Sequence, residues 1–275
     1  MKGRGFRMKK SLCTTGFKDW TVEQIVGWMR PYGFDGIELW IGHIERYQEE
    51  HGPLDKLRSF LEDSGLQVAG ICGYTTFSGG FSGERNLAEE RITMRRMLDA
   101  ARQLGCPLVR TFVGDRSSRF ASPEQWGLAA AELRAMCLAA DRYEVDIAAE
   151  IHYDTFVDDP DSALAMISAV HHPRFVLLFD GANLHYEKVD QISALERLYP
   201  HVRHVHLKNY RWDHDRRYDT QPAPAFSGDL DNGSLLLELK RRGYDGFVSL
   251  EYFGGHKLEH IAASLQRWKE LCGTA

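Results

Sequence analysis

The chain has 275 residues and a formal net charge of -5 at pH 7, with 43% hydrophobic and 27% charged residues. This composition supplies a large apolar core and excludes a low-complexity chain. The acidic balance argues against a nucleic-acid partner, because holding a polyphosphate requires a dense positive field. Nothing in the composition suggests a membrane partner.

The first ten residues, MKGRGFRMKK, are basic, and the next ten are SLCTTGFKDW. No apolar run of signal-peptide length develops there. We therefore expect a cytoplasmic protein with a disordered segment over residues 1–10 and a single domain over residues 11–275. One α/β barrel suits this length, because such barrels often occupy about 250 residues.

Short segments rich in β-branched and aromatic residues alternate with longer helical patterns along the whole chain. This alternation is typical of parallel βαβ units, and eight strands close a (β/α)8 barrel. We therefore predict the α/β class and a single-domain TIM barrel. The predicted strands are residues 11–17, 36–40, 67–74, 108–114, 146–152, 175–184, 202–210 and 247–253.

Helix boundaries follow from capping residues. Asp19 is predicted to cap the helix over residues 21–29, while Ser122 and Asp159 each precede a proline that suits the first helical turn. The predicted helix ends are glycines suited to a left-handed C-cap, namely Gly65, Gly105 and Gly243. No linker or internal repeat divides the chain.

Two strand-to-helix loops are long, over residues 73–86 and 209–233. In a barrel such loops lie over the C-terminal face, where active sites form. Both are candidate substrate lids. The second loop also holds basic residues and a glycine-rich FSGDLDNG stretch, which leaves open whether the substrate carries a phosphate.

Four polar residues stand near the ends of four successive predicted strands: Glu150, Asp180, His206 and Glu251. Neighbouring strand ends in a closed barrel can direct their side chains to one point. Burying three carboxylates together is unfavourable unless a cation neutralises them. Three oxygens and one imidazole nitrogen suit one divalent metal ion, with Mn²⁺ expected first and Mg²⁺, Co²⁺, Fe²⁺ or Zn²⁺ as alternatives.

Other polar residues on the same strands are candidate substrate contacts. His152 and Lys208 each lie two residues beyond a predicted ligand, so each shares its ligand's strand face. A loop hydrogen bond for His152 and an ion pair for Lys208 are the structural alternatives. The remaining candidates are Asn183 and His185, which follow Asp180, and Glu38 and Arg110, which could also pair with each other. His204 is expected to be structural.

The five cysteines, Cys13, Cys72, Cys106, Cys137 and Cys272, contain no CxxC pair. Their scattered placement is typical of ordinary core residues. We expect reduced thiols without a catalytic role.

These features resemble one known family, the xylose-isomerase-like barrels, also called the sugar phosphate isomerase/epimerase or AP endonuclease family 2 superfamily. The resemblance spans nearly the whole chain, and its carriers are GFDGIELW, AAEIH, LLFDGANLH, HVHLKN and GYDGFVSLEYFGG. It implies that Glu150, Asp180, His206 and Glu251 bind the catalytic metal. It also implies that Glu150 and Glu251 exchange protons with the substrate.

The reaction expected from the resemblance is isomerisation or epimerisation of a sugar or sugar phosphate through a metal-stabilised enediolate. Asn183 departs from the histidine that ketose 3-epimerases often carry three residues after the strand-six aspartate. The alternative in the same superfamily is a dehydratase or lyase similar to inosose or dehydroshikimate dehydratases, in which proton removal is followed by loss of hydroxide.

Two further alternatives have less support. A nuclease similar to endonuclease IV needs a three-metal cluster with additional histidines, which GICGYTTF and VRTFVGD lack. A non-catalytic sugar-binding barrel would not need an intact set of four ligands. The expected partner is a small carbohydrate, and the resemblance implies a homodimer or homotetramer.

Overall fold

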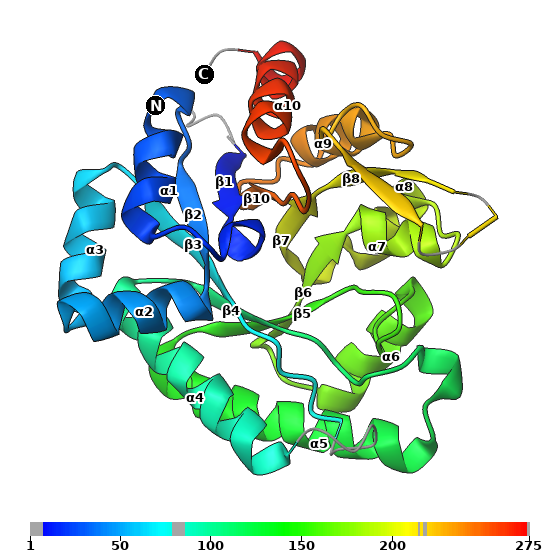
Figure 1. Cartoon of the computed structure of the whole chain (residues 1–275). Helices are drawn as coiled ribbons and strands as arrows, with labels where there is room; N and C mark the ends of the chain where they lie inside the picture. The colour runs from blue at the N-terminus through cyan, green and yellow to red at the C-terminus, as the bar shows by residue number, and fades with distance from the viewer. Residues whose placement is uncertain (1–7, 79–85, 214, 217–218, 274–275) are drawn as a thin grey trace, which may run out of the picture.

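The structure is a computed structural model that describes residues 8–78, 86–213, 215–216 and 219–273. Eight parallel strands pair in one ring, with the helices outside it (Figure 1). The ring consists of β1 (Lys9–Cys13), β2 (Gly36–Trp40), β3 (Gln67–Cys72), β4 (Leu108–Thr111), β5 (Asp146–Glu150), β6 (Phe175–Asp180), β7 (Val202–Leu207) and β10 (Phe247–Leu250). Strand β1 pairs with both β2 and β10, so the barrel is closed and the predicted TIM barrel is confirmed.

The outer layer is formed by helices that pack their apolar faces on the strands. They are α1 (Val22–Met29), α2 (Ile41–His51), α3 (Leu54–Asp63), α4 (Leu87–Leu104), α5 (Pro123–Ala140), α6 (Pro160–Val170), α7 (Gly181–Tyr186), α8 (Gln191–Leu198), α9 (Asn232–Arg241) and α10 (Lys257–Cys272). Within the described residues, no helix is both long and apolar enough to cross a membrane.

Two of the three predicted helix caps are confirmed. Ser122 and Asp159 form capping boxes at the starts of α5 and α6. Asp19 is wrong as the cap of α1, because Thr21 accepts the Gln24 N–H while the Gln24 side chain accepts the Thr21 N–H. The three predicted glycine stops, Gly65, Gly105 and Gly243, all have positive φ angles.

Several predicted boundaries need correction. The predicted strand over residues 175–184 ends at Asp180, because Asp180 caps α7 by accepting the backbone N–H groups of Ala182 and Asn183. Residues 14–17 form a short 3-10 helix instead of extending β1. Lys9 and Lys10 belong to β1, so the prediction of disorder over residues 1–10 is wrong there, while residues 1–7 lie outside the described residues.

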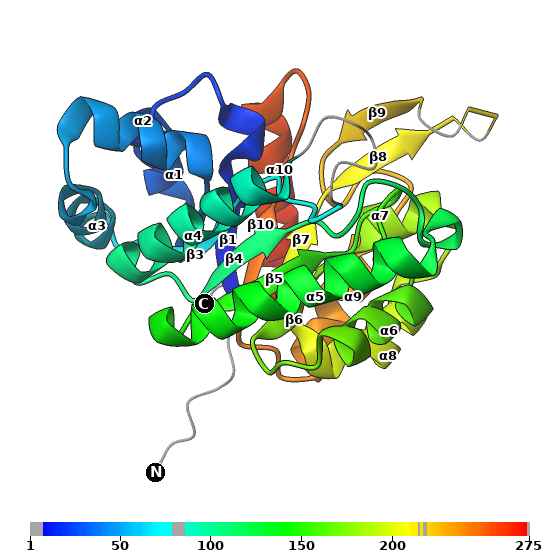
Figure 2. The ribbon, with the colours of Figure 1, turned by 90° about the horizontal axis from the view of Figure 1, so that it is seen from below.

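The long loop over residues 209–233 contains a hairpin that the sequence analysis missed. Strands β8 (Asn209–Trp212) and β9 (Thr220–Ala223) pair antiparallel in a separate two-stranded sheet. Figure 2 shows this hairpin beside α7 at the edge of the barrel. Of the other predicted lid, residues 79–85 lie outside the described residues. The role of both loops as lids stays a prediction.

The inside of the barrel is polar above a small apolar layer. Leu108, Ala148, Val176 and Leu178 form an apolar cluster separate from the main core. Around the rest of the interior lie buried charged and polar side chains from both sides of the ring, including Glu38, Arg110, His204 and Ser249. These groups surround the ends of β5, β6, β7 and β10.

Candidate metal centre

The structure brings the four predicted metal ligands together. Glu150 and Asp180 are the last residues of β5 and β6, His206 lies near the end of β7, and Glu251 directly follows β10. One ligand atom from each lies within 4.8 Å of the others. All four side chains are buried. The arrangement follows from strand register, because Asp180 pairs with His206, and Ser249, two residues before Glu251, pairs with His206 from the other side.

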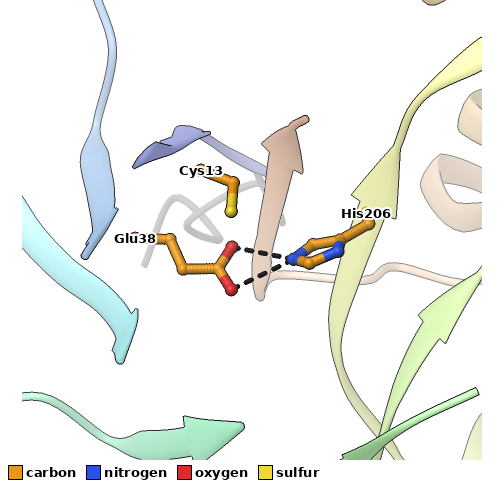
Figure 3. A group of neighbouring side chains, drawn as sticks. All are labelled: Cys13, Glu38 and His206. Carbon is orange, nitrogen blue, oxygen red and sulfur yellow. Dashed lines mark hydrogen bonds and ion pairs between the residues drawn. The ribbon is translucent and has the colours of Figure 1, made fainter. Parts of the chain in front are cut away.

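His206 is held from across the barrel by Glu38. The Nε2 atom of His206 lies 3.0 and 2.9 Å from the two carboxylate oxygens of Glu38, as Figure 3 shows. A proton on Nε2 donates to this carboxylate. The other ring nitrogen, Nδ1, can then present its lone pair to a metal ion.

The Nδ1 atom of His206 points at the three carboxylates. It lies 3.4 Å from Glu251 Oε2, 3.7 Å from Asp180 Oδ2 and 3.8 Å from Glu150 Oε1. This buried nitrogen makes no hydrogen bond. A lone pair facing three anions is repulsive, so a cation must stand between them. Either a proton on Nδ1 or a bound metal ion meets that need, and the two compete for the same atom.

The pKa of His206 is raised well above its usual value. Burial lowers it, but the charges of Glu38 and Glu251 outweigh that effect. Without a metal ion the ring therefore holds a second proton, and a metal ion would displace it from Nδ1.

The charges inside the barrel fit one divalent cation. Among the described residues, the acids buried inside the barrel around this centre are Glu38, Glu150, Asp180 and Glu251, and the buried cations that contact them are Arg110 and Lys208. With neutral histidines, four negative charges face two positive ones. One divalent ion restores neutrality, which burial strongly favours. The donor set and the unpaired Nδ1 both fit such an ion.

Glu150 is ionised and tightly held. Arg110 Nη1 donates to Glu150 Oε2 at 2.8 Å, and Asn183 Nδ2 donates to Glu150 Oε1 at 3.0 Å. Burial raises the pKa of Glu150, but the charge of Arg110 and neighbouring cations offsets this and lowers it to about 2. Arg110 and Asn183 therefore contact a predicted metal ligand, and their role as substrate contacts stays a prediction.

Lys208 also contacts the ligand carboxylates. Its ammonium nitrogen lies 2.8 Å from Asp180 Oδ2 and 2.9 Å from Glu251 Oε2. Burial lowers the pKa of Lys208, but the charges of these carboxylates raise it by more. The pKa therefore lies well above its usual value, and the ammonium group is charged. Lys208 therefore forms the ion pair that was the structural alternative for this residue. A contact between Lys208 and the substrate stays a prediction.

One interpretation of the sequence paired Glu38 with Arg110. The structure does not place these two side chains in an ion pair. Beyond its contact with His206, the Glu38 carboxylate lies 2.9 Å from His204 Nε2 and accepts the Cys72 S–H at 2.7 Å. The expectation that Glu38 reaches substrate finds no support in these contacts, because both oxygens face buried donors. His204, which was expected to be structural, is fully buried and also contacts Ser249 Oγ at 2.9 Å.

His152 follows the end of β5 and is partly exposed. Its Nδ1 atom lies 2.7 Å from the Tyr153 carbonyl oxygen, to which it donates. The ring packs edge-on against Phe112 and stacks on Tyr153. Burial lowers the pKa of His152, which favours the neutral ring.

His185 packs on the Trp212 ring of the hairpin, with ring centroids 4.1 Å apart, and its role as a substrate contact stays a prediction. The sequence analysis also missed Thr15, whose Oγ1 donates to Glu251 Oε1 at 3.0 Å. All five cysteines are free thiols, as predicted. Cys13 and Cys72, however, lie inside the barrel. Their inward-facing positions on their strands are the sequence signal that could have predicted this location.

Known enzymes resemble this chain over most of its length. The 3-dehydroshikimate dehydratase of Bacillus anthracis is 24% identical over 94% of this chain and 96% of its own. A protein of Streptomyces coelicolor named "Putative hydroxypyruvate isomerase" is 28% identical over 81% of this chain and 82% of its own. The inosose dehydratase of Clostridium botulinum is 24% identical over 89% of each chain.

Solved structures share the fold. A probable 3-DHS dehydratase from Bacillus anthracis, involved in petrobactin synthesis, superposes with a TM-score of 0.86 at 24% identity, covering 95% of this chain and 99% of its own. The IOLI protein, solved with a zinc atom, has a TM-score of 0.80 at 18% identity, covering 96% and 98%. The model of the xylose isomerase-like TIM barrel family matches residues 26–271, and the chain belongs to that family.

Proposed function

We propose that the chain is a divalent-metal-dependent dehydratase of a small polyhydroxylated ketone, such as an oxidised cyclitol or sugar. The enzyme removes a proton from the carbon next to the carbonyl and expels hydroxide from the following carbon. Two of the three similar proteins named above are dehydratases, which supports placing a dehydratase ahead of an isomerase or epimerase. The sequence analysis had favoured an isomerase or epimerase.

The observation that carries the proposal is the state of His152. Because its Nδ1–H donates to the Tyr153 carbonyl, its Nε2 lone pair is free to act as a base. The ring is partly exposed, burial favours its neutral form, and it stands two residues after Glu150. Elimination requires one such base, whereas epimerisation requires proton transfer at two faces of a carbon.

The two glutamates are less suited to proton removal. Both oxygens of Glu150 accept hydrogen bonds, from Arg110 and Asn183. Both oxygens of Glu251 are also engaged, by Thr15 and Lys208. Carboxylates stabilised in this way are weak bases and good metal ligands.

Glu150, Asp180, His206 and Glu251 would hold one divalent ion, with Mn²⁺ expected first for three oxygens and one nitrogen. When bound, this ion supplies a Lewis acid that polarises the substrate carbonyl. His152 Nε2 takes the proton, and the electron pair of the broken C–H bond becomes the new C=C bond as the C–O bond breaks. The leaving hydroxide takes the proton from the His152 imidazolium, which yields water and regenerates the base.

The second candidate is the isomerase or epimerase, with Glu150 and Glu251 as the proton-transfer pair. The observation that favours it is that the two carboxylates stand on the same side of His206, 3.8 and 3.4 Å from its Nδ1 atom. A small carbohydrate substrate, a cytoplasmic location and a homodimer or homotetramer stay predictions under either candidate. A nuclease is not proposed, because the two metal-capable groups of the described residues share His206.

The test incubates the manganese-loaded protein in D₂O with a panel of keto-cyclitols, dehydroshikimate-like ketones, ketoses and ketose phosphates. The proposal expects loss of water with formation of a C=C bond, followed by NMR. His152→Gln should lower kcat by about 10²–10⁴-fold, as is typical for loss of a general base, with metal content unchanged. The control is His51→Gln, since His51 is 45% exposed and pairs with surface acids. Deuterium exchange or epimer formation without water loss, abolished by Glu150→Gln or Glu251→Gln and retained in His152→Gln, would establish the second candidate instead.

A further inference from the structure

A second group of potential metal ligands lies on the opposite side of the His206 ring. Cys13 from β1, Glu38 from β2 and His206 from β7 each offer one ligand atom, and these atoms lie within 4.8 Å of one another. Figure 3 shows the Cys13 sulfur beside the Glu38 carboxylate, which faces the His206 ring. All three side chains are buried. The ligand atom of His206 in this group is on the ring edge that faces Glu38.

A second sulfur, that of Cys72, lies beside this group and contacts two of its three members, Cys13 and Glu38. The Cys72 Sγ atom lies 3.9 Å from Cys13 Sγ and donates to Glu38 Oε1 at 2.7 Å. Two thiolates on one tetrahedral zinc ion, each with a metal–sulfur distance of about 2.3 Å, would stand about 3.8 Å apart. The two thiols therefore already have the spacing that a shared cation of this class requires.

We propose that Cys13, Cys72, Glu38 and His206 Nε2 form a separate site for a thiophilic divalent cation of the zinc and cadmium class. Thiolate and imidazole ligands select such soft or borderline ions, whereas the site of three carboxylates and one imidazole nitrogen suits harder ions. The two sites share one imidazole ring and use different nitrogens of it. The inference concerns ion binding and goes beyond the proposed reaction.

Binding is balanced by proton release. The Cys13 and Cys72 thiols and the His206 Nε2–H each lose a proton to solvent as their sulfur and nitrogen atoms bind the cation. The two thiolates and the deprotonated His206 ring contribute three negative charges against the two positive charges of the ion. The buried interior can therefore accept the cation without an excess of positive charge, and uptake should be accompanied by acidification of the medium.

The experiment is ¹¹³Cd NMR of the full chain carrying Cys272→Ser, because Cys272 is partly exposed and could bind cadmium by itself. We expect two resonances, one in the range of oxygen and nitrogen ligation and one shifted toward thiolate ligation. Cys13→Ser and Cys72→Ser should each remove the thiolate resonance. Cys137→Ser, the control at a buried thiol of α5, should leave it unchanged.

Absence of the thiolate resonance in the Cys272→Ser chain overturns the inference without relying on any variant inside the barrel. Its persistence in both Cys13→Ser and Cys72→Ser overturns it as well. Asp180→Asn separates this inference from the proposed function, because it should remove only the resonance of oxygen and nitrogen ligation. If that resonance is present and the thiolate resonance is not, the further inference fails and the proposed metal centre stands.

Discussion

The two halves of the barrel contribute different chemistry to the same centre. Strands β5, β6, β7 and β10 end in the residues that form the predicted ligand set. Strands β1 to β4 contribute groups that contact those ligands, such as Glu38, which reaches His206 from across the barrel, and Arg110, which contacts Glu150 from the neighbouring strand. One half supplies donor atoms for a cation, and the other supplies orientation and charge balance.

The two kinds of residue, the predicted ligands and the groups that contact them, differ in how readily the sequence identifies them. A buried acid or histidine at the end of a strand is informative by itself, because it needs a partner of opposite charge. Glu38 is also a buried acid, but its role depends on which residues lie on the opposite side of the barrel axis. The supporting half is therefore tested best by variants that leave all four ligands in place.

The largest expected effect is at Arg110. Arg110→Met should lower the free energy of unfolding of the metal-free protein by about 3–5 kcal/mol, because Glu150 then becomes a buried charge without its partner. The Arg110 and Glu150 side chains are only 3% and 1% exposed. Urea denaturation in the presence of a chelator measures the change.

Arg102→Met is the matched control for that variant. The Arg102 and Asp99 side chains are 58% and 47% exposed, so their ion pair should contribute about 1 kcal/mol at most. Equal, small losses in both variants would mean that Arg110 does not balance the buried charge of Glu150.

The next effect is on metal affinity. Glu38→Gln should weaken binding of the divalent ion about 10–100-fold, because a carboxylate that orients a ligating histidine is replaced by a neutral amide. Competition with a chromophoric chelator measures the affinity. Glu62→Gln is the control, since the Glu62 side chain is 59% exposed and pairs with Arg58. Unchanged affinity in Glu38→Gln would show that the ring of His206 is oriented without Glu38.

The smallest effect is expected far from both halves of the centre. Ser122→Ala removes the capping box of α5 and should cost about 1 kcal/mol of stability with metal affinity unchanged. Ser59→Ala, at an exposed position inside α3, should cost less. A change in metal affinity in Ser122→Ala would indicate that the centre is coupled to the outer helices, contrary to this account.

The sequence predicted the barrel because the alternation of strands and helices is regular, and it predicted the four-residue ligand set from residue type and strand position. It missed the role of Glu38, because contacts across the barrel axis depend on how strands are staggered. The predicted sixth strand continued into α7. The helix begins directly after its side-chain cap at Asp180, so no turn separates the two elements. The pairing of β8 with β9 was missed because the second strand, TQPA, is polar and contains proline.

The residues at the ends of β5, β6, β7 and β10 are expected to bind one divalent ion. The most direct measurement is elemental analysis of the protein after loading with manganese and extensive dialysis, comparing the native chain with Asp180→Asn, which keeps the α7 cap possible. We expect one manganese ion per native chain and nearly none in the variant. Three ions per chain, or equal manganese in both proteins, would contradict this expectation.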